Sequence, residues 1–300
     1  MSKGVHIVLP GSAIQSDAGI ILKTAVSVLF LIPWGDKWIV GTTDTPYTGD
    51  RAEPYASRED VQYILDQANR VLEPKLKAEE IIGVYAGLRP LVANKKSSTT
   101  TKLSREHTVD RPVPGFVSIA GGKYTTYRVM GKDAVDRAVI ELRRLTRESV
   151  TEKLPLVGAD GFFALEQQRE RIAQESGLDA ETVTHLLNRY GSLISEILEI
   201  IAQEPKLAKK LDPELAYIKA EIVYAASHEG ARTVDDVISR RTRLAFEAQD
   251  HGVHLADEVA ALIAPVLGWS AKNRKESVTA YEELVDRELA ALDELLEANS

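Results

Sequence analysis

The charge and the Gly and Pro content of the chain change near residue 147, and this change limits the folds that the chain can adopt. Through residue 146 it carries 20 Lys and Arg against 16 Asp and Glu, whereas the remainder carries 17 against 29. Of its 19 Gly and 12 Pro, 12 and 8 respectively lie before residue 147. Gly and Pro punctuate short elements, and an acidic stretch poor in both favours helices. We therefore predict an α/β domain over residues 1–146 and an all-α domain over residues 155–300, joined by a linker within 149–161.

Composition excludes several classes of protein. The chain is 44% hydrophobic and 27% charged, values typical of a globular protein, and it has no Cys for disulfides, thiolate metal sites or Cys nucleophiles. Its longest apolar run, residues 25–34, is shorter than the ~20 residues of a membrane helix. Residues 1–10 enter a strand-like pattern directly, unlike a signal peptide, so we expect a cytoplasmic protein. The acidic second half makes nucleic acid an unfavourable partner.

The first half shows strand and turn patterns. Apolar or β-branched runs bounded by turn residues predict strands over residues 5–9, 26–32, 38–40, 81–88 and 116–119. Gly35-Asp36 predicts a hairpin between the second and third of these. Ser57 and Asp60 have the spacing of a capping box, which predicts a helix whose apolar face extends to Leu72.

The second half shows helical periodicity. Pro213 has the position of a first-turn proline, with Leu215, Ile218 and Ile222 in register behind it. An N-cap is predicted at Thr233. Two further helices, over 256–267 and 279–296, are separated by Gly268-Trp269-Ser270. A domain of five or six helices accounts for this pattern most simply.

One segment combines a strand, a Gly-Gly turn and a helix. Gly121-Gly122-Lys123 follows a predicted strand and precedes a helix predicted over about 125–145. The two Gly permit close backbone approach, Lys123 adds a positive charge, and Thr125 and Thr126 can cap the helix or bind an oxygen. Amides at such a helix start can face an anion or an electron-rich carbonyl. The alternative interpretation is an ordinary helix start after a tight turn.

Three further residues are candidates for chemistry. Arg89 lies at a strand end before Pro90, where a guanidinium can bind a phosphate or carboxylate, or can equally pair with a structural carboxylate. Arg105 stands beside Glu106, which favours a surface pair when that segment is taken alone. His6 lies in a predicted strand, where a hydrogen-bonded structural role is more common than a role as a base.

Several catalytic motifs are absent from the sequence. HExxH and GxSxG do not occur, so zinc-dependent and serine hydrolases have no support and no metal site is predicted. GxGxxG does not occur either, so the chain lacks a dinucleotide-binding opening of its own.

Together these motifs resemble the C-terminal portion of the FAD-dependent glycerol-3-phosphate dehydrogenases. The resemblance rests on segments in matching order along nearly the whole chain: residues 4–10, 30–34, 39–44, 87–91, 104–107, 121–128, 219–226, 235–243 and 267–270. It implies a mixed-sheet unit that binds substrate and the flavin edge, followed by a C-terminal helical domain. Members of the family also have an N-terminal Rossmann segment that binds the ADP part of FAD, so the chain resembles a fragment that lacks it.

The resemblance also implies roles for individual residues. His6 matches a histidine that accepts the proton of the C2 hydroxyl of glycerol 3-phosphate, and Arg89 and Arg105 match ligands of the substrate phosphate. Lys123 matches a lysine near the flavin, and Gly122, Thr125 and Thr126 lie at the cofactor-facing helix start. No role is implied for His107.

The implied reaction is hydride transfer from glycerol 3-phosphate to FAD, which gives dihydroxyacetone phosphate. Electrons then pass to quinone, at a peripheral site on the inner face of the cell membrane. The sequence does not decide between quinone and oxygen as the electron acceptor, and it does not show whether the protein forms a homodimer. On its own, the chain is expected to bind FAD weakly and to be inactive. The alternative is a catalytically silent fragment that acts as a helical interaction module.

Overall fold

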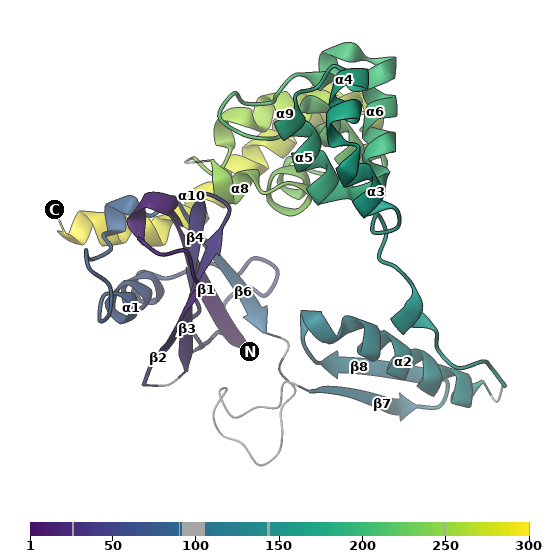
Figure 1. The fold of residues 1–300 in the computed structure, drawn as a ribbon. Helices are drawn as coiled ribbons and strands as arrows, with labels where there is room; N and C mark the ends of the chain where they lie inside the picture. Colours follow the sequence, from purple (N-terminus) through teal and green to yellow (C-terminus); the bar gives the residue numbers. More distant parts are fainter. Residues whose placement is uncertain (26, 90, 92–105, 143–144, 249, 300) are drawn as a thin grey trace. The chain divides into compact units, whose positions relative to one another are not determined.

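The chain forms two compact units, which are described here one at a time. The computed structural model describes residues 1–25, 27–89, 91, 106–142, 145–248 and 250–299 (Figure 1). One unit comprises Met1–Leu154 and Ala290–Ser300, and the other comprises Pro155–Leu289. The division after Leu154 lies inside the predicted linker, and the last residues group with the first unit. No described helix is long and apolar enough to cross a membrane.

A six-stranded sheet forms the centre of the first unit. Its strands are β1 (Ser2–Pro10), β2 (Ile20–Lys23), β3 (Val28–Trp34), β4 (Lys37–Gly41), β5 (Thr45–Pro46) and β6 (Gly83–Arg89). They run in the order β2-β3-β4-β1-β5, and β6 also pairs with β1. The predicted hairpin at Gly35 joins β3 to β4, and β1 lies between β4 and β6. Every pair of described strands is antiparallel, so the parallel pairing that a mixed sheet implies is not found among them.

Helix α1 (Arg58–Ala68) covers one face of this sheet and has the predicted capping box. The Asp60 amide bonds to Ser57 Oγ, and the Asp60 carboxylate accepts from the Ser57 amide in return. The helix ends before Leu72, so the prediction that its apolar face reaches that residue was wrong. The Asn69 side chain bonds to both backbone groups of Leu76 and so directs the chain out of the helix.

The two faces of β1 differ because side chains alternate along a strand. Val5, Ile7 and Leu9 are fully buried, as are Val61 and Ile64 of α1, which packs against β1. Burying such side chains contributes about 1.5–3 kcal/mol each. On the opposite face of β1, Val8 is also fully buried, whereas His6 is partly exposed and is the residue of that face available for a site.

A second part of the first unit is a hairpin covered by a helix. Strands β7 (His107–Val113) and β8 (Phe116–Gly121) pair antiparallel, and α2 (Tyr127–Glu141) packs on both. The predicted helix over 125–145 was too long, since Tyr124–Thr126 form a 3-10 turn instead. The prediction also missed β7, which contains Pro112 and has no apolar run. None of the residues of α2 is buried.

The second unit is helical, with more and shorter helices than the five or six predicted. Its α-helices are α3 (Phe162–Gln167), α4 (Arg169–Ser176), α5 (Ala180–Tyr190), α6 (Ile194–Gln203), α7 (Lys219–Ser227), α8 (Leu244–Glu247), α9 (Ala256–Leu267) and the long α10 (Ala271–Asn299), which belongs to this unit as far as Leu289. A π-helix spans Asp236–Arg241. In the described part of the last hundred residues there is no strand, but one isolated bridge joins Lys210 to Ile218.

The predicted helix start at Pro213 was wrong. Helix α7 begins at Lys219, because the preceding backbone pairs across a loop instead of coiling. The Leu211 amide donates to the Tyr217 carbonyl, and the Lys219 amide donates to the Lys209 carbonyl. The helix predicted over 256–267 is confirmed, and the one predicted over 279–296 lies within α10, which begins earlier, at Ala271.

A buried carboxylate links α5 to α7. Glu221 is fully buried and accepts hydrogen bonds from the Ile218 amide (2.8 Å) and the Tyr190 hydroxyl (3.1 Å). Its other contact is with His185 Nε2 at 2.9 Å, and Arg189 Nε lies 4.0 Å away. A buried charge is tolerated when its lone pairs are satisfied in this way.

We expect Glu221→Ala to destabilise the helical unit by about 3 kcal/mol, because it leaves a buried amide and a buried hydroxyl without their acceptor. Urea denaturation of the full chain, followed by circular dichroism, measures this loss. The exposed Glu199 of α6 is the matched control, and Glu199→Ala should change stability by less than about 0.5 kcal/mol. Equal effects of the two substitutions would contradict the role assigned to Glu221.

Candidate active site

The site face of the sheet centres on His6 of β1. His6 is paired with Gly41 of β4 on one side and with Tyr85 of β6 on the other. The His6 and Tyr85 rings are stacked, with centroids 5.0 Å apart and planes 13° apart. A Cβ atom on Gly41 would lie 2.3 Å from His6 Cδ2, so only glycine fits opposite the imidazole. The strand register therefore brings these three residues together.

Arg89 lies on the same face, at the end of β6. Its Nη1 donates to Ser2 Oγ and to the Lys3 carbonyl, each at 3.1 Å. Its Nη2 donates to Thr42 Oγ1 at 3.1 Å and to the Thr43 carbonyl at 2.8 Å. Four protein acceptors thus hold the guanidinium in place.

A carboxylate also lies beside this guanidinium. Asp44 Oδ1 is 3.6 Å from Arg89 Nη1, and its side chain is 3% exposed. Asp44 also accepts a hydrogen bond from the Ser2 hydroxyl. The structural pairing considered for Arg89 from the sequence is therefore present, within the same cluster that holds the guanidinium on the site face.

Two glycines lie beside the imidazole and the guanidinium. Gly4 and Gly87 are paired across β1 and β6, two residues, or about 7 Å, from His6 and Tyr85. A Cβ atom on Gly4 would lie 2.6 Å from both Arg89 Nη2 and Thr42 Oγ1, so the guanidinium itself lies over Gly4. A Cβ atom on Gly87 would meet nothing within 4 Å among the described residues. Of the two glycines, only Gly87 therefore leaves open space on the face that carries His6 and Arg89.

Burial and charge keep His6 neutral. Burial and, to a lesser extent, the nearby Arg89 charge together lower the pKa of His6 to about 4. Burial also raises the pKa of Tyr85 to about 12, so its hydroxyl stays protonated. At neutral pH the imidazole of His6 is thus available to accept a proton.

The Gly121–Thr126 turn is fixed from both sides. Gly121 and Gly122 have φ angles of +78° and +81°, which glycine adopts without strain. A Cβ atom on Gly122 would lie 2.4 Å from Met130 Sδ and 3.2 Å from His107 Cβ. His107 Nε2 in turn lies 2.8 Å from Asp133 Oδ2 of α2.

The predicted capping role within this turn falls to Thr126. Its Oγ1 accepts from the Lys123 amide (3.1 Å) and donates to the Lys123 carbonyl (2.9 Å). Lys123 and Thr125 are exposed, and Tyr124 is 92% exposed. Lys123 and Thr125 are thus accessible to a ligand, and their meeting with His6 at one cofactor stays a prediction.

The structure accounts for only some of the residues predicted from the sequence. His6 and Arg89 lie on one face of the sheet, while Arg105 lies outside the described residues, so its convergence with Arg89 stays a prediction. Sequence reasoning missed Tyr85 and the contact of Gly41 with His6. Their positions opposite His6 follow from strand register, which a single sequence does not reveal.

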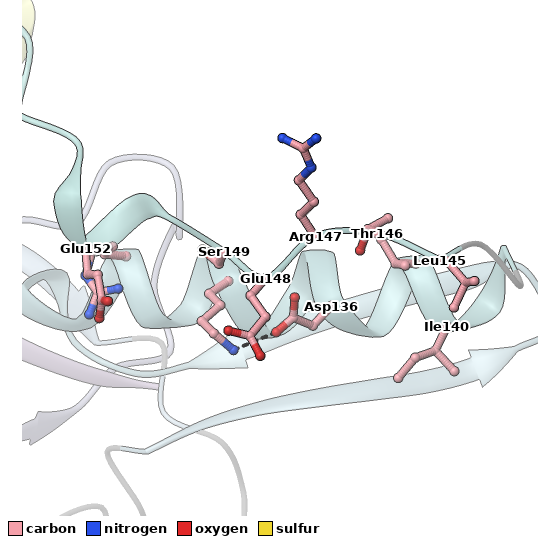
Figure 2. A pocket seen from close by; sticks show the side chains of 11 residues that line it. Asp136, Ile140, Leu145, Thr146, Arg147, Glu148, Ser149 and Glu152 are labelled. Carbon is pink, nitrogen blue, oxygen red and sulfur yellow. Dashed lines mark hydrogen bonds and ion pairs between the residues drawn. The ribbon is translucent and has the colours of Figure 1, made fainter.

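A separate cavity of about 680 Å³ lies between α2 and the segment after it (Figure 2). Arg128, Lys132 and Arg147 line it, opposed by an equal number of acids, and Lys132 pairs with Asp136 at 2.6 Å. Figure 2 shows Arg147 extending away from the helix. Because its charges balance, this cavity suits an anion less well than the face that carries Arg89. In the part of the chain that is described, no group of three or more His, Cys, Asp or Glu is placed to hold a metal ion.

Comparison with known proteins identifies the family of the chain. Residues 149–274 match the family model of the C-terminal domain of alpha-glycerophosphate oxidase. The chain is 49% identical over 288 residues to glycerol-3-phosphate dehydrogenase 2 of Mycobacterium tuberculosis, and 35% identical over 286 residues to the mitochondrial glycerol-3-phosphate dehydrogenase of Mus musculus. These matches cover 96% and 92% of this chain. They confirm the resemblance predicted from the motifs, and the chain is a relative of the glycerol-3-phosphate dehydrogenases.

A solved structure agrees with the fold. The glycerol-3-phosphate dehydrogenase from Bacillus halodurans, complexed with FAD, is similar over 95% of this chain, with a TM-score of 0.79 and 26% identity. The predicted combination of a strand-containing unit and a C-terminal helical domain is thereby confirmed. The chain covers 56% of that structure, 49% of the Mycobacterium tuberculosis relative and 39% of the mouse relative. It therefore spans about half the length of the curated relatives that it matches.

We expect Gly122→Ala to destabilise the β7–β8 hairpin by about 1 kcal/mol more than Gly115→Ala. Both glycines have a positive φ, so alanine strains the backbone equally at the two positions. Only the Gly122 substitution also meets Met130 and His107, because a Cβ atom on Gly115 has nothing within 4 Å. Hydrogen exchange of the hairpin amides measures both losses, and equal losses would contradict the crowding at Gly122.

The pKa of His6 predicts a pH dependence of stability. Its folded value of about 4 lies below the ordinary value of 6.5, so the unfolded chain binds more protons between these pH values. The contribution of neutral His6 is complete above about pH 6.5 and is lost as the pH falls toward 4. Between about pH 7 and pH 4, β1 amide protection should fall by ~2 kcal/mol more in the unsubstituted chain than in His6→Gln. The same fall in both would show that His6 is not buried as described.

Proposed function

We propose that the chain supplies the substrate-binding and flavin-edge parts of an FAD-dependent glycerol-3-phosphate dehydrogenase, which oxidises glycerol 3-phosphate to dihydroxyacetone phosphate. The observation that carries the proposal is that the neutral imidazole of His6 and the guanidinium of Arg89 lie on one face of the sheet, with open space over Gly87 between their strand positions. A small alcohol with one anionic group matches this pair of partners in charge. The names of the relatives support the same substrate.

The residues of the sheet have complementary tasks in this reaction. Arg89 binds the substrate phosphate, together with Arg105 as the family resemblance implies, and so orients the C2 hydroxyl toward His6. A ring nitrogen of His6 accepts the hydroxyl proton as the C2 hydride leaves. The phosphate opposes the charge of Arg89, so its binding raises the pKa of His6 toward the range useful for a base.

The turn at Gly122 fits the edge of a flavin better than the rest of FAD. Lys123 offers a charge, and Gly122, Thr125 and Thr126 belong to the turn that precedes the helix. These groups suit the carbonyl edge of an isoalloxazine ring. FAD, when bound there, supplies the acceptor for the C2 hydride.

A further polypeptide segment is needed to bind the ADP part of FAD, because the sequence has no GxGxxG motif. Exposed apolar side chains support this requirement. On α2, Val135 and Ile140 are 61% and 64% exposed, and Phe116 of β8 is 55% exposed. Surfaces of this kind mark a site of association. Transfer of electrons to quinone, a peripheral position on the inner face of the membrane and a cytoplasmic location stay predictions of the family resemblance.

The first test measures whether the chain alone is an enzyme. We expect the 300-residue chain to bind FAD weakly and to show negligible dye reduction dependent on glycerol 3-phosphate. Adding the portion of the Mycobacterium tuberculosis relative that lies outside the matched region should restore both the yellow colour and turnover. Stoichiometric FAD and turnover in the isolated chain would contradict the need for a second segment. Failure to restore either, with both pieces folded, would favour the silent helical module.

Arg89 is tested in the restored enzyme. Arg89→Ala should raise KM for glycerol 3-phosphate by about 10–100-fold and change kcat much less, because the phosphate is bound in both the ground state and the transition state. The exposed Arg58 at the start of α1 is the control, and Arg58→Ala should leave KM unchanged. An unchanged KM in Arg89→Ala would show that Arg89 serves only its internal acceptors.

A further inference from the structure

The imidazole of His6 is confined from both sides by its strand neighbours. Tyr85 covers one side with a nearly parallel ring at 5.0 Å. On the β4 side, the backbone of Gly41 approaches so closely that a Cβ atom there would lie 2.3 Å from His6 Cδ2 and 2.7 Å from Cγ. Neither residue has a place in the reaction described above, and both are fixed by the pairing of β1.

We propose that Tyr85 is a positioning residue, whose ring holds the His6 imidazole against Gly41 and shields it from water, so that His6 is presented in one orientation and without charge. The inference deepens the proposed function, because it names what prepares the base of that site. It assigns to the aromatic ring of Tyr85, rather than to its hydroxyl, the main part of the effect.

The charged groups around His6 are compatible with this role of the Tyr85 ring. Arg89 of β6 lowers the pKa of His6, but burial is the larger cause, and the stacked Tyr85 ring contributes to that burial. Asp44 is paired with Arg89 and with Ser2. Lys3 and Asp60 pair with each other at 2.5 Å on the α1 side of the sheet. Among the described residues, the stacked Tyr85 ring and the Arg89 charge are thus groups that favour the neutral form of His6.

The test is an NMR titration of the 300-residue chain, without FAD or substrate. His6→Gln identifies the His6 signal among those of the six histidines. We expect Tyr85→Leu to raise the pKa of His6 by about one unit, a tenfold gain in proton affinity, as water reaches the ring. Tyr85→Phe keeps the aromatic ring and should change that affinity by less than about twofold. The exposed Tyr55 is the matched control, and Tyr55→Leu should leave the His6 pKa unchanged.

A second measurement needs no variant, which keeps the proposal testable if Tyr85→Leu does not fold. In the unsubstituted chain, the His6 ring protons should show nuclear Overhauser contacts with the Tyr85 ring and upfield ring-current shifts. Absence of both would overturn the proposal. An unchanged His6 pKa in a folded Tyr85→Leu chain would also overturn it, and so would a rise in Tyr85→Phe equal to that in Tyr85→Leu.

These measurements are independent of the reaction. If the restored enzyme fails to oxidise glycerol 3-phosphate while the titration behaves as expected, the proposed function fails and the positioning of His6 stands. In an active restored enzyme, Tyr85→Leu should move the acidic limb of the pH profile of kcat/KM to higher pH. Tyr85→Phe, which keeps the aromatic ring, should leave that limb where it is in the unsubstituted enzyme. A limb that does not move in Tyr85→Leu would contradict the role of Tyr85 in catalysis.

Discussion

The guanidinium of Arg89 is the interaction on which the candidate site depends. It binds the start of β1 through Ser2 and Lys3, and the segment after β4 through Thr42 and Thr43. A partly buried cation needs such acceptors, because water no longer solvates it fully. These bonds join three segments that are distant in the sequence, and they fix the cation before any ligand arrives. A site organised in advance spends less binding free energy on ordering its own groups.

The charge of Arg89 also influences the protonation state of His6. Arg89 and burial together keep His6 uncharged, which is the form that can take a proton. A pKa near 4 makes a weak base at neutral pH, so an anionic substrate that opposes the charge of Arg89 would strengthen the base as it binds. Binding and proton transfer are then coupled through one guanidinium.

The two units satisfy their polar groups in different ways. In the helical unit, Glu221 is fully buried, and its carboxylate is matched by an amide, a hydroxyl and an imidazole. In the first unit, α2 has no buried residue, and apolar side chains such as Ile140 remain exposed. The helical unit also leaves apolar side chains exposed, among them Val157 and Phe163, so exposed apolar surface is not confined to the first unit. On the first unit, the exposed side chains of α2 are the surface on which the further segment that we propose would pack.

Local patterns determined those elements whose stability is local. The capping box at Ser57, the hairpin at Gly35 and the helix at Ala256–Leu267 follow from short-range hydrogen bonds and periodicity, and each was predicted from the sequence. Predictions failed where distant partners decide the outcome. Pro213 begins no helix because residues 209–219 pair across a loop, and Asn69 ends α1 by binding Leu76.

The candidate site divides in the same way. The sequence by itself singled out Arg89 and the Gly122–Lys123 turn as candidates, and the family resemblance made His6 a candidate base. Tertiary structure alone decided that Tyr85 stacks on His6 and that Gly41 closes its other side. The physical reason is register: side chains on neighbouring strands meet only when the strands pair, and a shift of one residue would turn His6 to the opposite face.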